Sequence, residues 1–217
     1  MMSVIKSADN TTVDLTVRHK VTAIRDLKSL LNDIVPLIKD PRYLYKGREL
    51  RNFLLRPREI LANWLICGVK NYEVGPDKWT FSTDPTGGDG LIVERSTGIG
   101  WRTEHVFIAT LESSQNDSVE DLMIKAVEHK HQKGEAYAEG KQLVIFADVT
   151  RGKWIPNQVG HRIKGQHGFD SVWAAGLEQT DGNNYEYWVI CFDELPSQVW
   201  KVSIDIELIE WNVERIQ

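Results

Sequence analysis

Four consecutive segments decide the expected fold: DPTGGDGLIVE (84–94), TEHVFIA (103–109), SVEDLMIKAVEHKHQKGEAYAEG (118–140) and KQLVIFADV (141–149). The first, second and fourth contain short apolar runs rich in β-forming residues, which predict strands over 90–94, 104–109 and 143–147. The third has apolar residues at helical spacing behind Ser118, a suitable N-cap, and predicts a helix over 118–139. The order strand, strand, helix, strand indicates an α/β fold.

Helical patterns precede this region and strand patterns follow it. Apolar positions three and four apart predict helices over 17–38, where Pro36 would kink or end the helix, and over 57–70, which begins at Pro57. A strand is predicted over 72–81, and after residue 149 the pattern is mostly strand. We therefore expect a single domain, 1–217, made of a helical part (17–70), a core (72–148) and a β-rich extension (149–217).

The composition is that of an ordinary globular protein of 217 residues, long enough to bury about 70% of its unfolded surface. The sequence shows neither a signal peptide nor an apolar run of membrane-spanning length, which predicts a cytoplasmic protein. Cys67 and Cys191 each lie in an apolar run, which favours buried free thiols over a zinc site or a nucleophile. No phosphate loop, nucleophile elbow or dinucleotide-binding motif occurs in the sequence.

Charge is unevenly distributed along a chain whose net charge is −5. Residues 39–58 hold seven basic and two acidic residues, and residues 151–167 hold four basic residues and no acidic one. Residues 178–215 hold nine acidic and two basic residues. Such asymmetry would place a basic face over phosphates and an acidic face away from them. Interleaved charges are also typical of an ordinary solvated surface, and that alternative stays open.

Two acids stand at the predicted starts of the first two core strands. Asp89 leads into LIVE, and Glu104 leads into HVFIA. Carboxylates on neighbouring strands can share Mg²⁺, which prefers oxygen ligands, and a metal held beside a sheet suits phosphodiester hydrolysis. The glycines around Asp89 let the backbone approach a ligand closely. Two alternatives remain: Asp84 is a competing acid in the same loop, and both aspartates are typical turn residues.

The order helix (57–70), three strands, helix (118–139), strand (143–147) resembles that of the PD-(D/E)xK nuclease superfamily, whose motif acids Asp89 and Glu104 match. The resemblance covers residues 57–148. It implies a restriction-endonuclease-like mixed sheet flanked by helices, with the helical N-terminal part and the β-rich C-terminal extension outside this nuclease-like core. It also implies Mg²⁺ or Mn²⁺ as the cofactor, bound by Asp89 and Glu104.

The superfamily carries a lysine two residues after the Glu, where this chain has Val106. That departure removes a cation that would position water and stabilise developing charge. Lys130 is a replacement, because it continues the buried face of Ala126 and Val127 and because some superfamily members carry their lysine on this helix. A buried lysine needs a carboxylate partner, and Glu104 and Asp89 are the expected ones. The alternative is that Lys130 extends to solvent near the helix end.

Other charged residues extend the candidate site. Glu59 resembles the acid that many superfamily members place on the first helix, although a pairing with a neighbouring arginine at the helix start is the favoured alternative. Residues 161–167 (HRIKGQH) are a candidate basic loop over a substrate. Basic side chains expected to contact nucleic acid are those of Arg48, Arg51, Arg56, Arg58 and Lys164.

Together these features predict a metal-dependent nuclease, a hydrolase in which Asp89 and Glu104 bind Mg²⁺ or Mn²⁺ and Lys130 replaces the missing lysine, with Glu59 as a further site residue. The alternative is a catalytically inactive relative of the same fold that binds nucleic acid or a protein. Val106 and an acidic pI of about 5.7 favour it. The expected partner is nucleic acid, DNA first, and no membrane. A homodimer would suit cleavage of both strands.

Overall fold

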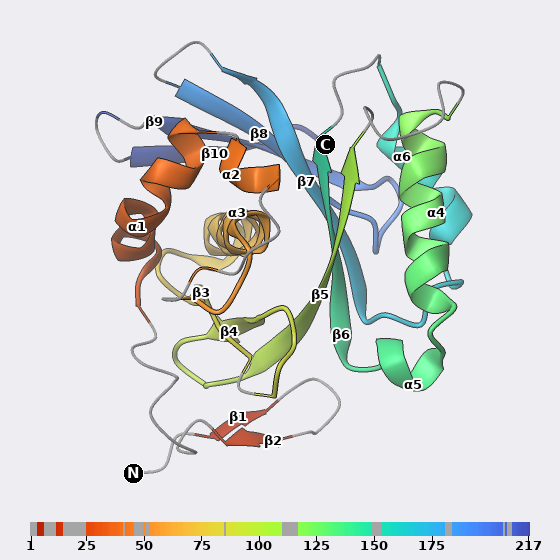
Figure 1. Cartoon of the computed structure of the whole chain (residues 1–217), viewed down its shortest axis with the longest axis horizontal. Helices are drawn as coiled ribbons and strands as arrows, with labels where there is room; N and C mark the ends of the chain where they lie inside the picture. The colour runs from red at the N-terminus through yellow and green to blue at the C-terminus, as the bar shows by residue number, and fades with distance from the viewer. Residues whose placement is uncertain are drawn as a thin grey trace.

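The computed structural model describes residues 4–6, 12–14, 25–40, 42–45, 50, 53–84, 86–109, 117–148, 153–180, 184–205, 207 and 210–217. Their architecture is mixed α/β: one eight-stranded sheet with helices packed on both faces (Figure 1). A separate two-stranded hairpin, β1 (Val4–Lys6) and β2 (Thr12–Asp14), stands near the N-terminus. None of the helices in these ranges combines the length and the apolarity that crossing a membrane requires.

The large sheet has the strand order β10-β9-β8-β7-β6-β5-β4-β3. Its strands are β3 (Trp79–Ser82), β4 (Leu91–Glu94), β5 (Gly100–Ala109), β6 (Lys141–Asp148), β7 (Ser171–Thr180), β8 (Asn184–Cys191), β9 (Gln198–Asp205) and β10 (Glu210–Arg215). The pairs β5–β6 and β6–β7 are parallel, and the other pairs are antiparallel. Parallel neighbours need a crossover, and a helical segment supplies it in both cases. The C-terminal strands thus continue the same sheet as the core strands.

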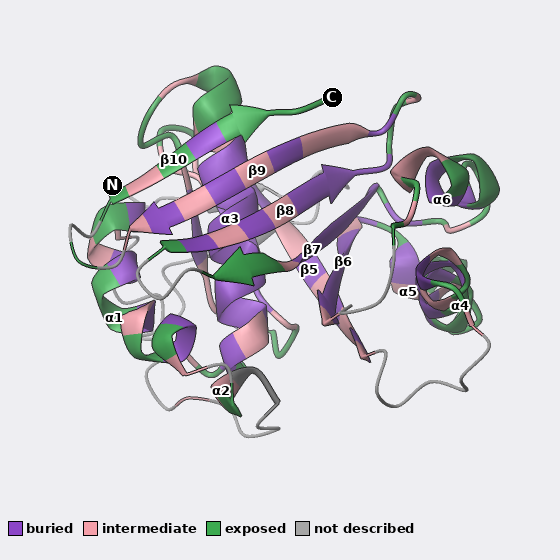
Figure 2. Ribbon diagram, turned by 90° about the horizontal axis from the view of Figure 1, so that it is seen from above, coloured by how far each residue is buried: buried purple, intermediate pink, exposed green. Residues whose placement is uncertain are grey.

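One face of the sheet is covered by α3 (Pro57–Val74) and, outside it, by α1 (Leu27–Lys39) and α2 (Arg42–Tyr45). Pro57 suits the first turn of α3, and the Glu59 carboxylate accepts the Arg56 N–H at 2.8 Å. Almost every residue of α3 from Pro57 to Val69 is buried, as expected for a helix enclosed on all sides (Figure 2).

The opposite face is covered by α4 (Val119–His131), α5 (Glu135–Ala138) and α6 (Pro156–Ile163). Ser118 and Asp121 form a capping box that starts α4. Gly134 has a φ of 101°, which glycine adopts without strain, and it turns the chain from α4 into α5. Because side chains alternate along a strand, each strand contributes to the two cores on either side of the sheet.

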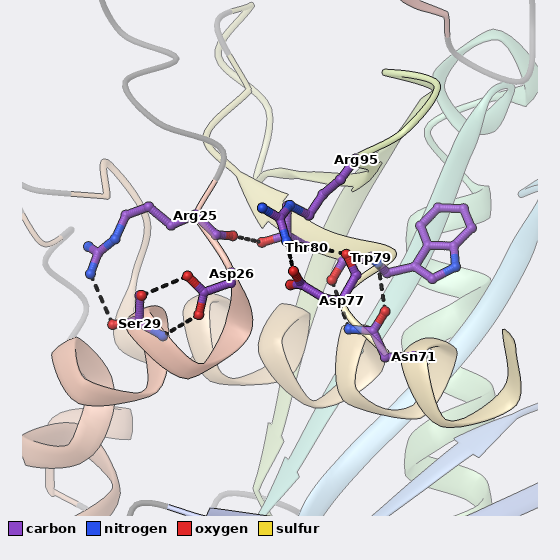
Figure 3. Close-up of polar contacts among 8 residues, drawn as sticks. All are labelled: Arg25, Asp26, Ser29, Asn71, Asp77, Trp79, Thr80 and Arg95. Carbon is purple, nitrogen blue, oxygen red and sulfur yellow. Dashed lines mark hydrogen bonds and ion pairs between the residues drawn. The ribbon is translucent and has the colours of Figure 1, made fainter. Parts of the chain in front are cut away.

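Polar contacts fix the β3 edge of the sheet to α1 and α3 (Figure 3). The Thr80 hydroxyl donates to the Arg25 carbonyl at 2.6 Å. The Asn71 side chain pairs with both backbone groups of Trp79, at 2.9 and 2.6 Å. Asp26 caps α1 by accepting the Ser29 N–H at 2.8 Å. The contacts of Thr80 and Asn71 thus join the helical layer to β3, the strand that precedes the loop of Asp89.

Several predicted boundaries need correction. The strand expected over 72–81 is wrong in its first part, because α3 continues to Val74 and β3 begins at Trp79. The expected single helix over 118–139 is two helices, α4 and α5, separated at Gly134.

The remaining differences concern β5, the predicted basic loop and the first predicted helix. β5 begins at Gly100 rather than at residue 104, because residues 100–102 pair with β4. Part of the predicted basic loop over 161–167 belongs to α6, a helix that the sequence reading missed. The helix expected over 17–38 is present from Leu27, and residues 17–24 lie outside the described residues.

Candidate functional site

Asp89 lies in the loop between β3 and β4 and is bonded to the middle of β5. Backbone pairing of β4 with β5 ends near Gly90, whose carbonyl accepts the Thr103 N–H at 2.9 Å. Two residues further along β5, the His105 N–H donates to Asp89 Oδ2 at 2.8 Å. The Asp89 carboxylate therefore accepts a backbone N–H of β5 at the point where β4 no longer pairs with β5. This bond holds the carboxylate beside residues 104 and 105.

The competing acid of this loop, Asp84, serves the turn instead. Its Oδ1 atom accepts the Thr86 N–H at 2.8 Å and the Thr86 hydroxyl at 2.7 Å. Its Oδ2 atom lies 3.6 Å from Arg102 Nε, and only 1% of its side chain is exposed. Asp84 therefore acts as a turn residue, which is the alternative that the sequence left open for both aspartates.

Glu104 stands in the middle of β5, so the expectation that it opens the strand is wrong. It pairs in register with Leu143 of β6, and its neighbours on the same face, Val106 and Ile108, pack into the core under α4. A lysine on α4 can reach Glu104 because this face of β5 lies under that helix.

Lys130 makes that contact. Its Nζ donates to Glu104 Oε1, as the sequence predicted, and the two side chains are 11% and 14% exposed. Burial tends to raise the pKa of Glu104, but hydrogen bonds from Lys130 and the Tyr137 hydroxyl outweigh burial, and the net pKa is lowered. Glu104 is therefore ionised at neutral pH, and the alternative of a solvent-directed Lys130 does not apply.

Three carboxylates act on one another at this place. Burial raises the pKa of Asp89, the His105 N–H lowers it, and the charge of Glu104 raises it again. Burial also raises the pKa of Glu59, and the charge of Asp89 adds to that rise. Glu59 is 4% exposed and its Oε1 atom lies 3.5 Å from Arg56 Nη1, so the predicted alternative, a pairing with an arginine at the helix start, is confirmed. Two of these acids also have a cation beside them, Arg56 at Glu59 and Lys130 at Glu104, so the place combines carboxylates with compensating positive charge.

A buried polar cluster supports Asp89 from the side of α3. His105 Nε2 lies 3.1 Å from Asn63 Oδ1, and burial lowers the pKa of His105 to about 3, so its ring is neutral. A Cβ atom on Gly90 would stand 2.7 Å from Asn63 Nδ2 and 3.1 Å from Thr103 Oγ1. The residue after Asp89 must therefore be glycine, because the loop passes directly over these side chains.

The predicted nucleic-acid contacts fall into three groups. Arg56 and Arg58, at the start of α3, are close enough to Asp89 to influence it electrostatically. The Arg58 guanidinium also stacks 5.1 Å from the centre of the Phe107 ring. Lys164 is exposed at the end of α6 and, in the described part of the chain, contacts neither Asp89 nor Glu104. Arg48 and Arg51 lie outside the described residues.

A divalent cation needs several oxygen ligands, and protein side chains supply only some of them here. Among the described residues, no three His, Cys, Asp or Glu side chains are grouped closely enough to hold a metal. Mg²⁺, however, keeps several waters and is often bound through only one or two carboxylates. Asp89 binds the His105 N–H through Oδ2, and its carboxyl is destabilised by Glu104. A cation bound by Asp89 and Glu104 would offset that repulsion, so the chemistry of these two donors suits a hard cation such as Mg²⁺ or Mn²⁺.

Sequence reasoning missed three contributors to the site: Asn63, Tyr137 and Lys133. Asn63 is fully buried on α3, and a polar residue inside the run EILANWLICGV (59–69) was an available signal. Tyr137 bonds to Glu104 and Lys133 bonds to Tyr137 because the helix breaks at Gly134. Gly134 directly follows a basic helical turn, and this was an available signal for the helix end. No protein-family model, curated protein or solved structure matches the chain.

Proposed function

We propose that this protein is a divalent-cation-dependent nuclease built on a restriction-endonuclease-like core. The observation that carries the proposal is the contact of Lys130 with Glu104 beside Asp89. Lysine and carboxylates come from three separate elements, α4, β5 and the β3–β4 loop, and they meet at one partly buried place. The order α3, β3, β4, β5, α4, β6 also agrees with the core order implied by the resemblance to PD-(D/E)xK nucleases.

In this proposal Asp89 and Glu104 hold the cation. When bound, the cation would supply Lewis-acid activation of water and neutralise charge on the phosphate. Lys130, which donates to Glu104, keeps that carboxylate ionised and stands where it can stabilise negative charge that develops on the phosphate. Arg56 and Arg58 compensate the charge of Asp89 and would attract the nucleic-acid backbone to the same place.

A second candidate function is binding of nucleic acid or protein without hydrolysis. Two observations favour it: Val106 stands where the superfamily carries its lysine, and Glu104 is already engaged by Lys130 and Tyr137. A salt bridge of this kind can stabilise a fold without any catalytic role. The two functions differ in whether the bond to phosphorus breaks, and a cleavage assay separates them.

The test is plasmid nicking with Mg²⁺ and, separately, with Mn²⁺. Wild-type protein is compared with Glu104→Ala and with Glu214→Ala, which removes an exposed glutamate on β10. Cleavage that needs the cation, survives Glu214→Ala and is lost in Glu104→Ala is the expected result. Cleavage retained by Glu104→Ala would overturn the assignment. Absence of cleavage by the folded wild-type protein would favour the binding function.

A further inference from the structure

Two lysines converge on the ring of Tyr137, next to the candidate site. Lys133 Nζ lies 4.6 Å from the centre of the ring, and Lys141 Nζ lies 4.0 Å from it. Lys133 Nζ also donates to the Tyr137 hydroxyl at 3.1 Å. The same hydroxyl is a hydrogen-bond partner of Glu104. The tyrosine thus joins two ammonium groups to a carboxylate of the site.

The backbone places these residues by a sharp change of direction after α4. Lys133 lies in the turn before Gly134, Tyr137 lies on α5, and Lys141 is the first residue of β6. Phe169 packs edge-on against the tyrosine ring, with centroids 6.4 Å apart and an interplanar angle of 82°. Phe169 therefore holds the ring, whose hydroxyl is directed to Glu104.

Neither lysine has a carboxylate partner in the part of the chain that the structure describes. Other lysines of the chain do: Lys125 pairs with Asp117, and Lys201 pairs with Glu186. A cation–π contact at an exposed position contributes only about 0.5–1 kcal/mol, so the ring orients the ammonium groups without neutralising them. Two oriented positive charges beside a carboxylate site are suited to an anionic ligand.

We infer that Lys133 and Lys141, held by Tyr137, form a subsite for a backbone phosphate of nucleic acid beside Asp89 and Glu104. This inference rests on the proposed function and adds the surface on which the strand lies. The two carboxylates repel a phosphodiester, and basic groups on both sides offset that repulsion. Arg56 and Arg58 act on Asp89 from the α3 side. Lys133 acts on Glu104 from the α5 side, and Lys141 shares the Tyr137 ring with it.

The inference is tested by fluorescence anisotropy with a labelled DNA duplex, in the presence of Ca²⁺ and at several salt concentrations. The test variant is Lys133→Gln/Lys141→Gln. The control is Lys28→Gln/Lys78→Gln, which removes the same charge from two exposed lysines on α1 and in the turn before β3. A third variant, Lys133→Arg/Lys141→Arg, keeps both charges and the contact with the ring.

Each lost phosphate contact lowers the salt slope of log K by about 0.9, so the test variant, which loses one phosphate subsite, should lose about 0.9 from the slope and bind roughly tenfold more weakly. The control should keep the wild-type slope, and the arginine variant should restore binding. Equal slopes for wild type and test variant would overturn the inference while leaving the nuclease proposal intact. If the test variant binds more weakly but the wild-type protein does not cleave plasmid, the subsite is supported and the nuclease proposal is contradicted. A wild-type protein that does not bind the duplex would overturn both.

Discussion

Removal of the Lys130 ammonium should destabilise the protein strongly, and Lys130→Met is the suitable change because it keeps an unbranched side chain. The ion pair with Glu104 is nearly buried, since the two side chains are 11% and 14% exposed. Removing one partner of a buried pair leaves an uncompensated charge, at a cost of about 3–5 kcal/mol. We expect about 3 kcal/mol, because Tyr137 still donates a hydrogen bond to Glu104.

For a chain of this length each kcal/mol lowers the melting temperature by about 2–4 °C, so the expected loss is about 6–12 °C. The loss should shrink as the pH falls. In the wild-type protein the lowered pKa of Glu104 contributes stability above the ordinary pKa of a glutamate, and this stability is lost as pH falls through the lowered value. In the variant, burial and Asp89 act on Glu104 without the lysine, and protonation at acidic pH relieves the cost.

The assay is urea unfolding of wild type, Lys130→Met, Glu104→Gln and the double variant at neutral and acidic pH. The double-mutant cycle should give a coupling free energy of about 1–3 kcal/mol. Lys125→Met is the matched control on α4, because its pair with Asp117 is exposed, and such a pair contributes at most about 1 kcal/mol. A loss under about 0.5 kcal/mol in Lys130→Met is the scale of ordinary surface substitutions. Such a loss, without coupling to Glu104, would show that the Lys130–Glu104 pair does not stabilise the fold.

Three further outcomes follow from the support of Asp89. In thermal unfolding, Gly90→Ala should cost about 1–3 kcal/mol more stability than Gly87→Ala. Both glycines have positive φ, but only a Cβ atom on Gly90 would meet a neighbouring side chain. Equal costs would contradict the close approach of Gly90 to Asn63. Asn63→Leu should cost about 1–3 kcal/mol, since it leaves the His105 ring without its partner, and a neutral result in urea unfolding would show that the contact is dispensable. Calorimetry at several pH values should show Mn²⁺ affinity rising with pH through the raised pKa of Asp89, because protons compete for the carboxylate until it ionises. A pH-independent affinity would place the cation elsewhere.

Periodic patterns predicted the elements of the core, and the misplaced boundaries have local physical causes. α3 continues past its expected end because Asn71 bonds the backbone of Trp79 and Gly75 ends the helix. β5 starts early because Gly100 pairs with Val93, a contact between two segments that a local apolar pattern does not reveal. α6 escaped prediction although Pro156 suits a first helical position.

The candidate site was predictable to the extent that it depends on faces of regular elements. Alternation along the strand placed Glu104 and Val106 on one face, and helical spacing placed Lys130 on the buried face of α4; their contact follows from those two periods. The role of Tyr137 depends on the turn at Gly134, and Asn63 supports the site only because the long helix α3 crosses beneath the loop of Asp89. Such tertiary contacts between distant segments have no local sequence signature.

The cation site is tested by a calorimetric titration of Mn²⁺ into the wild-type protein, Asp89→Asn and Asp77→Asn, the last of which changes an exposed aspartate before β3. We expect saturable binding to wild type and to Asp77→Asn, and a loss of at least about tenfold in affinity for Asp89→Asn, because the amide cannot supply the charge that a hard cation prefers. Identical titrations for wild type and Asp89→Asn would contradict a cation site shared by Asp89 and Glu104.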